Sequence, residues 1–132
     1  MKEQGRRILT IDDDAAVQDI LKRCFLDLGL NEDELLFVSD TADADQILEE
    51  SDSFPRLIFL NLILGEFDRG IVWLNKVRKD DRFKRTSIII LSAESRTEVK
   101  NTCKILGAGG FIEKPFDLEV VENKVREVLG IV

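Results

Sequence analysis

Residues 57–64 form a continuous apolar run that contains a single polar residue, Asn61. The run follows Pro55-Arg56 and ends at Gly65, which is typical of a strand buried on both faces of a sheet. A buried amide without partners costs about 1–3 kcal/mol, so Asn61 needs a structural or functional reason. The carboxyl end of a parallel strand, where such sheets open their binding crevice, supplies that reason. We therefore expect Asn61 to belong to a functional site.

The remaining apolar positions alternate between short β-rich runs and stripes with helical spacing. In the first stripe, Val17, Ile20 and Leu21 recur on one helical face, which Asp13 or Asp14 can cap and Gly29 can end. The pattern predicts an α/β fold with one domain over residues 1–132 and a parallel sheet covered by helices on both faces. The predicted strands span about 7–11, 34–38, 57–62, 87–91 and 110–113, and the predicted helices about 15–28, 41–51, 70–79, 97–106 and 117–129.

Composition narrows the possible chemistry. The net charge of −7 argues against nonspecific binding to nucleic acid or to an anionic membrane. No apolar run is long enough to span a bilayer, and the charged N-terminus does not resemble a signal peptide, so we expect a cytoplasmic protein. The chain has no histidine, which removes the commonest general base and transition-metal ligand. Cys24 and Cys103 both lie in helical stripes and are expected to be buried thiols.

Polar side chains follow several of the predicted strands at the point where each strand ends. They are Asp12 and Asp13 after the first strand, Asn61 after the third, Ser92 after the fourth and Lys114 after the fifth. The carboxyl ends of parallel strands share one edge, so these residues are expected to meet there. Carboxylates suit Mg²⁺, while a hydroxyl and an ammonium suit phosphate oxygens. Each residue alone could be a helix cap or a loop residue, but the combination points to one site.

In these features the sequence resembles a response-regulator receiver domain over essentially its whole length. The matching motifs are the acidic pair Asp12-Asp13, Ser92-Ala93 after the fourth strand and Lys114-Pro115-Phe116 after the fifth. The resemblance implies a flavodoxin-like (βα)5 fold with strand order 2-1-3-4-5. It also implies phosphate contacts from Ser92 and Lys114, and metal contacts from Asp12, Asp13 and the backbone carbonyl of Ile63.

The sequence departs from the family pattern at the position that carries the chemistry. Asn61 stands where the family has the aspartate that accepts the phosphoryl group. Gly65 replaces the usual proline, and the following loop holds one residue more because Arg69 separates Asp68 from Gly70. The switch aromatic in the fifth strand is Phe111, which lacks a tyrosine hydroxyl.

These departures predict a receiver-like domain that does not form the usual aspartyl phosphate and is not an enzyme. The amide has a neutral oxygen and a delocalised nitrogen lone pair, so it cannot replace the carboxylate nucleophile. Losing one charge at about 4 Å, with an effective dielectric near 20, weakens cation binding by roughly 4 kcal/mol before desolvation. We expect Mg²⁺ to bind weakly and no cofactor to be required. By the family resemblance, the partner is a kinase, an output domain or another signalling protein. It would bind the face formed by helix 97–106, strand 110–113 and helix 117–129.

Three alternatives remain open from the sequence. The domain could still be switched by another ligand or by phosphorylation elsewhere, for which Asp68 is the nearest carboxylate. Asp12-Asp13-Asp14 also offers the D-x-D of a haloacid-dehalogenase-like phosphatase, but the later acidic pair of that family is missing at Asn61-Leu62. Finally, Asn61 could be a substitution introduced to block phosphorylation, against which the altered loop argues.

Overall fold

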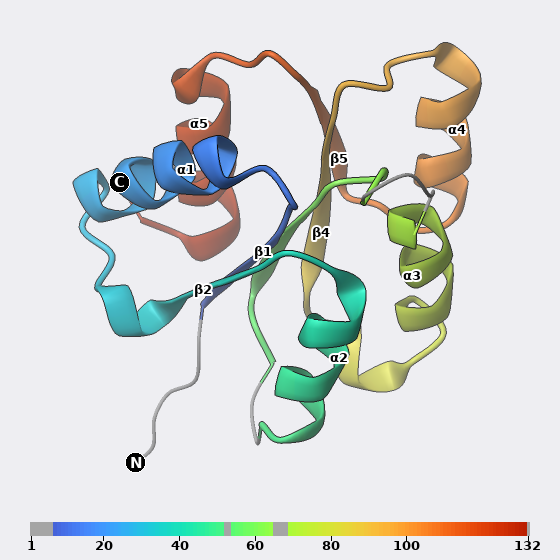
Figure 1. Ribbon diagram of the computed structural model, residues 1–132, viewed down its shortest axis with the longest axis horizontal. Helices are drawn as coiled ribbons and strands as arrows, with labels where there is room; N and C mark the ends of the chain where they lie inside the picture. The colour runs from blue at the N-terminus through green and yellow to red at the C-terminus, as the bar shows by residue number, and fades with distance from the viewer. Residues whose placement is uncertain (1–6, 52–53, 65–68, 132) are drawn as a thin grey trace.

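The computed structural model describes residues 7–51, 54–64 and 69–131, which contain one five-stranded parallel sheet in the order β2-β1-β3-β4-β5 (Figure 1). This confirms the predicted flavodoxin-like fold and strand order. The strands are β1 (Ile8–Ile11), β2 (Leu35–Val38), β3 (Leu57–Leu60), β4 (Ser87–Ser92) and β5 (Gly110–Glu113). The helices are α1 (Ala15–Asp27), α2 (Thr41–Glu49), α3 (Arg69–Val77), α4 (Thr97–Ile105) and α5 (Leu118–Leu129), with short 3-10 turns at Glu32–Glu34 and Asp81–Phe83.

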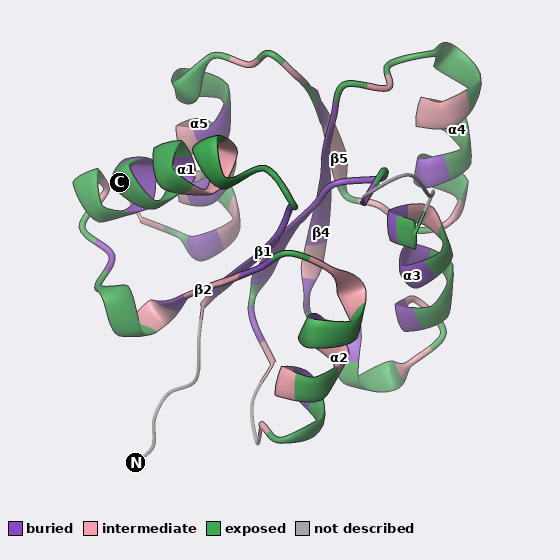
Figure 2. Ribbon diagram, viewed as in Figure 1, coloured by how far each residue is buried: buried purple, intermediate pink, exposed green. Residues whose placement is uncertain are grey.

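The helices cover the sheet in two layers, α1 and α5 on one face and α2, α3 and α4 on the other (Figure 1). Alternate residues of β3 enter the two cores: Leu57 and Phe59 face α1 and α5, whereas Ile58 and Leu60 face the opposite layer. All four are completely buried, as the purple strands in Figure 2 show. The prediction of a strand buried on both faces is therefore confirmed for β3.

The third strand, β3, ends at Leu60, two residues before the end of the predicted range of 57–62. The backbone N–H of Asn61 still donates to the carbonyl of Ile11 at 2.9 Å, but the regular strand has ended and the chain bends at Leu62. The carbonyl of Leu62 accepts a hydrogen bond from the N–H of Gly70 at 2.9 Å, which ties this turn to the start of α3. Asn61 is thus the first residue beyond the strand. Gly65 and Asp68 lie outside the described residues.

Smaller differences at the other element ends come from capping. Asp14 is the N-cap of α1 and Asp40 that of α2, because each carboxylate accepts backbone N–H bonds of the first turn. The second strand begins at Leu35 instead of residue 34, because Glu34 caps the preceding 3-10 turn by accepting from the N–H of Asn31. The predicted helix 41–51 ends at Glu49, because the N–H of Glu50 bonds to the carbonyl of Ile47, three residues back instead of four. Apolar periodicity does not register such local bonds, so the predicted boundaries were one or two residues off.

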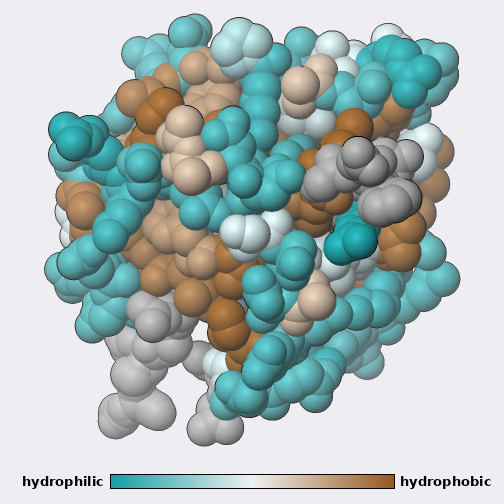
Figure 3. Space-filling model, in the orientation of Figure 1, coloured by the Kyte–Doolittle hydropathy of each residue, from teal (hydrophilic) through white to brown (hydrophobic). Residues whose placement is uncertain are grey.

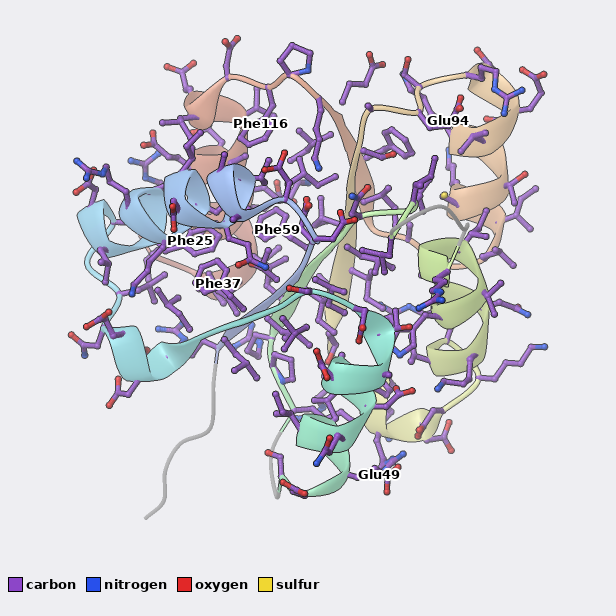
Figure 4. All side chains as sticks on the ribbon, viewed as in Figure 1. Phe25, Phe37, Glu49, Phe59, Glu94 and Phe116 are labelled. Carbon is purple, nitrogen blue, oxygen red and sulfur yellow. The ribbon has the colours of Figure 1, made fainter. Side chains whose placement is uncertain are left out.

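The core beneath α1 is built on stacked phenylalanine rings. Phe25 stacks on Phe37 with ring centroids 6.2 Å apart and on Phe59 with centroids 5.8 Å apart (Figure 4). Thr10 lies between Phe37 and Phe59 in the strand register, and its buried hydroxyl has no hydrogen-bond partner. A hydroxyl confined among aromatic rings destabilises the fold relative to a methyl group of the same shape.

Both cysteines are buried free thiols, as predicted. Cys24 packs with the α1–α5 core and Cys103 with the core on the other face of the sheet, so the sheet separates the two sulfur atoms. Burial raises the pKa of the Cys24 thiol to about 11, with smaller contributions from the negative charges of Glu122 and Asp27. The thiol therefore stays protonated at neutral pH and does not become a nucleophile.

On the face shown in Figure 3, hydrophilic residues predominate and hydrophobic residues gather in patches between them. Among the described residues, the most exposed large apolar side chains are Ile105 on α4 and Val72 on α3. Within the described ranges, no helix combines the length and apolar character needed to cross a bilayer.

Candidate functional site

The site begins at Asp12, the first residue after β1. Its backbone N–H donates to the carbonyl of Val38 at 3.1 Å, which extends the pairing of β1 with β2 by one bond. Its side chain is only 1% exposed. The carboxylate oxygen Oδ1 accepts from the N–H of Asp14 at 2.9 Å, so Asp12 and the cap of α1 fix each other's positions.

Two nitrogen atoms from distant parts of the chain meet this buried carboxylate. The Lys114 ammonium, in the loop after β5, lies 2.6 Å from Asp12 Oδ2 and forms an ion pair with it. The Asn61 amide nitrogen, at the end of β3, lies 3.5 Å from Asp12 Oδ1, which is the long limit of a hydrogen bond. The Lys114 side chain is 16% exposed and Asn61 is 9% exposed, so both reach the edge of solvent. The predicted meeting of Asp12, Asn61 and Lys114 is therefore observed.

Ser92, the last residue of β4, is also buried at this edge. Its backbone carbonyl accepts from the N–H of Lys114 at 2.9 Å, so the pairing of β4 and β5 brings the serine and the lysine together. The serine hydroxyl accepts from the N–H of Glu94 at 3.1 Å. This bond closes a turn in the loop after β4. It does not cap a helix, because the N-cap position of α4 is Arg96. Ser92 remains next to the site lysine. Glu94, labelled in Figure 4, points outward from the loop after β4 and pairs with Arg96.

Asp13, Ile63 and Phe111 complete the set predicted from the sequence. Asp13 is exposed beside Asp12, and the Ile63 side chain is partly exposed in the turn after Asn61. Phe111 is the second residue of β5, so it lies before the carboxyl end where the site forms, and it packs against the core on the α4 side. The Lys100 ammonium is 5.7 Å from the centre of the Phe111 ring and also pairs with Glu113. Helix α4 is thereby attached to the face of β5 that carries the aromatic ring.

Sequence reasoning missed two residues that hold the site in place. The Gln18 amide donates to the Asp12 carbonyl at 2.6 Å and to the Val38 carbonyl at 3.2 Å, which secures the ends of β1 and β2. Gly70 approaches the turn after β3 so closely that a Cβ there would lie 2.2 Å from the Asn61 carbonyl oxygen. A glycine at the start of a helix was visible in the sequence, but nothing local indicated which backbone it would touch.

The partners of Asp12 decide what a divalent cation would meet at this site. Both oxygens of Asp12 are engaged, Oδ2 by the Lys114 ammonium and Oδ1 by the N–H of Asp14 and the Asn61 amide nitrogen. Among the described residues, no group of three or more Asp, Glu, His or Cys side chains is placed to hold a metal ion. The buried negative charge of Asp12 is balanced by a lysine of the chain itself.

The comparisons with known proteins agree with this geometry. Residues 8–126 match the family model of the response regulator receiver domain. The chain belongs to that family. It is 27% identical over 128 residues to the chemotaxis protein CheY of Pseudomonas aeruginosa, covering 92% of this chain and 94% of the relative. It is also 27% identical over 124 residues to chemotaxis protein CheY1 of Helicobacter pylori, covering 94% of this chain and 97% of that protein.

Solved receiver structures share the fold of this receiver domain. The signal receiver domain of a DNA-binding response regulator from Colwellia psychrerythraea matches with a TM-score of 0.83 and 18% identity, covering 95% of this chain and 98% of its own. The receiver domain of a sensor histidine kinase from Pseudomonas aeruginosa, solved with a magnesium ion in its active-site cleft, matches with a TM-score of 0.77 and 21% identity, covering 96% and 99%. The chain is thus a receiver domain of two-component signalling, a class whose members act with kinases and output domains.

Proposed function

We propose that this receiver domain signals through its folded shape, without forming the aspartyl phosphate of its family. The observation that carries the proposal is the contact at the end of β3, where an amide faces Asp12 in place of a carboxylate. Phosphoryl transfer to a receiver needs a carboxylate oxygen as nucleophile, with cationic groups receiving the charge that spreads over the phosphoryl oxygens. The amide oxygen of Asn61 is neutral and does not form a stable acyl phosphate, so the domain has no catalytic turnover.

Weak magnesium binding is part of the same proposal. Lys114 already neutralises Asp12, and a cation would have to displace that ammonium or share the carboxylate with it. By the family resemblance, Asp13 and the backbone carbonyl of Ile63 are the further oxygen donors. Without a third carboxylate, we expect millimolar affinity and no requirement for a cofactor.

The proposed partner surface is the face formed by α4, β5 and α5. Ile105 on α4 is 84% exposed and Val120 on α5 is about half exposed, so apolar side chains are available there for a partner protein. Lys100 connects α4 to Phe111 and Glu113, which favours one arrangement of this face. A domain without a phosphoryl switch would present that arrangement to its partner constitutively. The two free thiols suit a reducing compartment, so we place the domain in the cytoplasm.

The experiment that tests this proposal is incubation of freshly purified protein with acetyl phosphate and Mg²⁺, followed by intact mass measurement. We expect the mass of the chain to stay unchanged, while the Asn61→Asp variant gains one phosphoryl group. The variant serves as the positive control, because it restores the acceptor in the same fold.

A phosphoryl group on the unaltered chain, before any change at Asn61, would overturn the proposal. Peptide mapping would then show whether another residue, such as Asp68, accepts the group. That result would support the alternative of a receiver switched by phosphorylation elsewhere.

A further inference from the structure

We propose that the site hydrolyses the side-chain amide of Asn61 to a carboxylate, so that the chain is synthesised without an acceptor and later acquires one. This inference rests on the proposed function, because it requires that Asn61 itself does not take up a phosphoryl group. The amide would then be a temporary block on phosphorylation. A receiver that signals through its shape when freshly made would later acquire a phosphoryl acceptor irreversibly.

The placement of Asp12 is the first observation that points to this reaction. Its carboxylate lies against the amide nitrogen of Asn61, the atom that must leave as ammonia. Amides hydrolyse slowly mainly because that nitrogen is a poor leaving group until it is protonated. A carboxylate held next to it can take a proton from water and then deliver one to the nitrogen, which is general acid–base catalysis.

The charge of Lys114 is the second observation. Its ammonium is held 2.6 Å from Asp12, the same carboxylate that the Asn61 amide contacts, so a fixed positive charge lies near the amide that water would attack. Fixed charges of this kind stabilise an oxyanion without reorganisation. The product also gains from this neighbour, because a new carboxylate at position 61 can pair with the ammonium whereas the amide cannot.

The step balances with water as the only co-reactant. Water attacks Cγ of Asn61 while Asp12 accepts a proton from it, and the bond from Cγ to Nδ2 then breaks as Asp12 returns that proton to the nitrogen. Ammonia leaves and carries away the proton of the new carboxylic acid as ammonium. An amide and water thus become a carboxylate and ammonium, and Asp12 is regenerated.

The backbone around Asn61 favours water over the other common nucleophile, the N–H of the following residue. Attack by that nitrogen requires the peptide unit to rotate into a five-membered ring. Here the unit is held on both sides, by the bond from Asn61 N–H to Ile11, by the bond from Gly70 N–H to Leu62, and by the tight packing of Gly70 against the Asn61 carbonyl. We expect water to be the nucleophile instead, because the site borders solvent: Asn61 is 9% exposed and the Lys114 side chain 16% exposed.

The test follows the mass of the full chain during incubation at neutral pH and 37 °C, with peptide mapping at each time. We expect the peptide containing Asn61 to gain the mass difference between amide and acid, with aspartate and no isoaspartate as the product. Asn75 on α3 is exposed and provides an internal control in the same sample. Because the reaction depends on the folded site, we expect Asn61 to convert faster than Asn75, and no faster than Asn75 when the chain is unfolded in urea.

Asp12→Asn is expected to slow the conversion by roughly 10²–10⁴-fold, the usual contribution of general acid–base catalysis. The comparison of folded with urea-unfolded chain keeps the test decisive if that variant does not fold. Conversion of Asn61 no faster than that of Asn75, or an isoaspartate product, would overturn the proposal.

Acetyl phosphate separates this inference from the proposed function. Fresh chain that accepts a phosphoryl group refutes the proposed function. Incubated chain that still carries the amide and accepts none refutes only the further inference.

Discussion

The substitution Asn61→Asp tests the electrostatics of the site most directly. It places a second carboxylate where the amide nitrogen lies 3.5 Å from Asp12 Oδ1. At an effective dielectric near 20, two unit charges at that distance repel by roughly 5 kcal/mol. Lys114, paired with Asp12, attracts the new charge and offsets much of this repulsion. We therefore expect the metal-free variant to lose about 1–3 kcal/mol of unfolding free energy.

Mg²⁺ should offset this loss of stability in the Asn61→Asp variant. A third carboxylate completes the set of charged ligands, and a cation that binds only the folded state stabilises it according to its concentration relative to Kd. At ten times Kd the gain is about 1.4 kcal/mol. The unaltered chain, which lacks that ligand, should gain much less.

The assay is thermal unfolding of both proteins in EDTA and over a series of MgCl₂ concentrations, with fresh protein whose intact mass matches the sequence. Asn75→Asp on exposed α3 is the matched control, because it adds the same charge away from the site. We expect the Asn61→Asp variant to melt several degrees lower in EDTA and to recover with Mg²⁺. A variant that is as stable as the unaltered chain in EDTA, or that responds to Mg²⁺ no more strongly, would refute the reasoning.

Four further predictions concern single groups. Lys114→Met leaves the buried Asp12 carboxylate without its ammonium and should cost about 3 kcal/mol in urea unfolding, the lower end for a broken buried pair because Lys114 is partly exposed; an unchanged midpoint would contradict this. Thr10→Val removes an unpartnered buried hydroxyl and should raise the unfolding free energy by about 1 kcal/mol, which urea titration would detect. Gly70→Ala should destabilise the fold by about 1–3 kcal/mol, because the added Cβ would collide with the backbone after β3. An unchanged melting temperature would show that this backbone can move aside. Burial raises the pKa of the Cys24 thiol from its ordinary 9.0 to about 11, so the stability that the buried thiol contributes is complete below pH 9 and is lost as the pH rises to 11. Urea unfolding of the unaltered chain and of Cys24→Ala over this pH range should show a smaller decline in the variant.

Much of the fold follows from the sequence because periodicity reports burial directly. The run at 57–64 predicted a strand buried on both faces, and β3 contributes alternate residues to both cores. The run did not reveal that the strand stops at Leu60, because Leu62 and Leu64 are buried as deeply as strand residues. Hydrophobicity indicates burial and not backbone direction. The N–H that bonds to the Leu62 carbonyl belongs to Gly70 of the following helix, α3, so the local sequence does not reveal it.

The sequence by itself also determined which chemical groups reach the site, because parallel strands end at a common edge. It therefore identified Asp12, Asn61, Ser92 and Lys114 as neighbours before any coordinates. Only the tertiary structure decided their pairing: the lysine binds Asp12, the amide faces the same carboxylate, and the serine hydroxyl accepts from the N–H of Glu94 in its own loop. Which side chains pair with one another depends on differences of a few ångströms in the positions of separate loops. Strand order determines which residues lie near one another at the sheet edge, whereas the packing of the loops determines which of them form contacts.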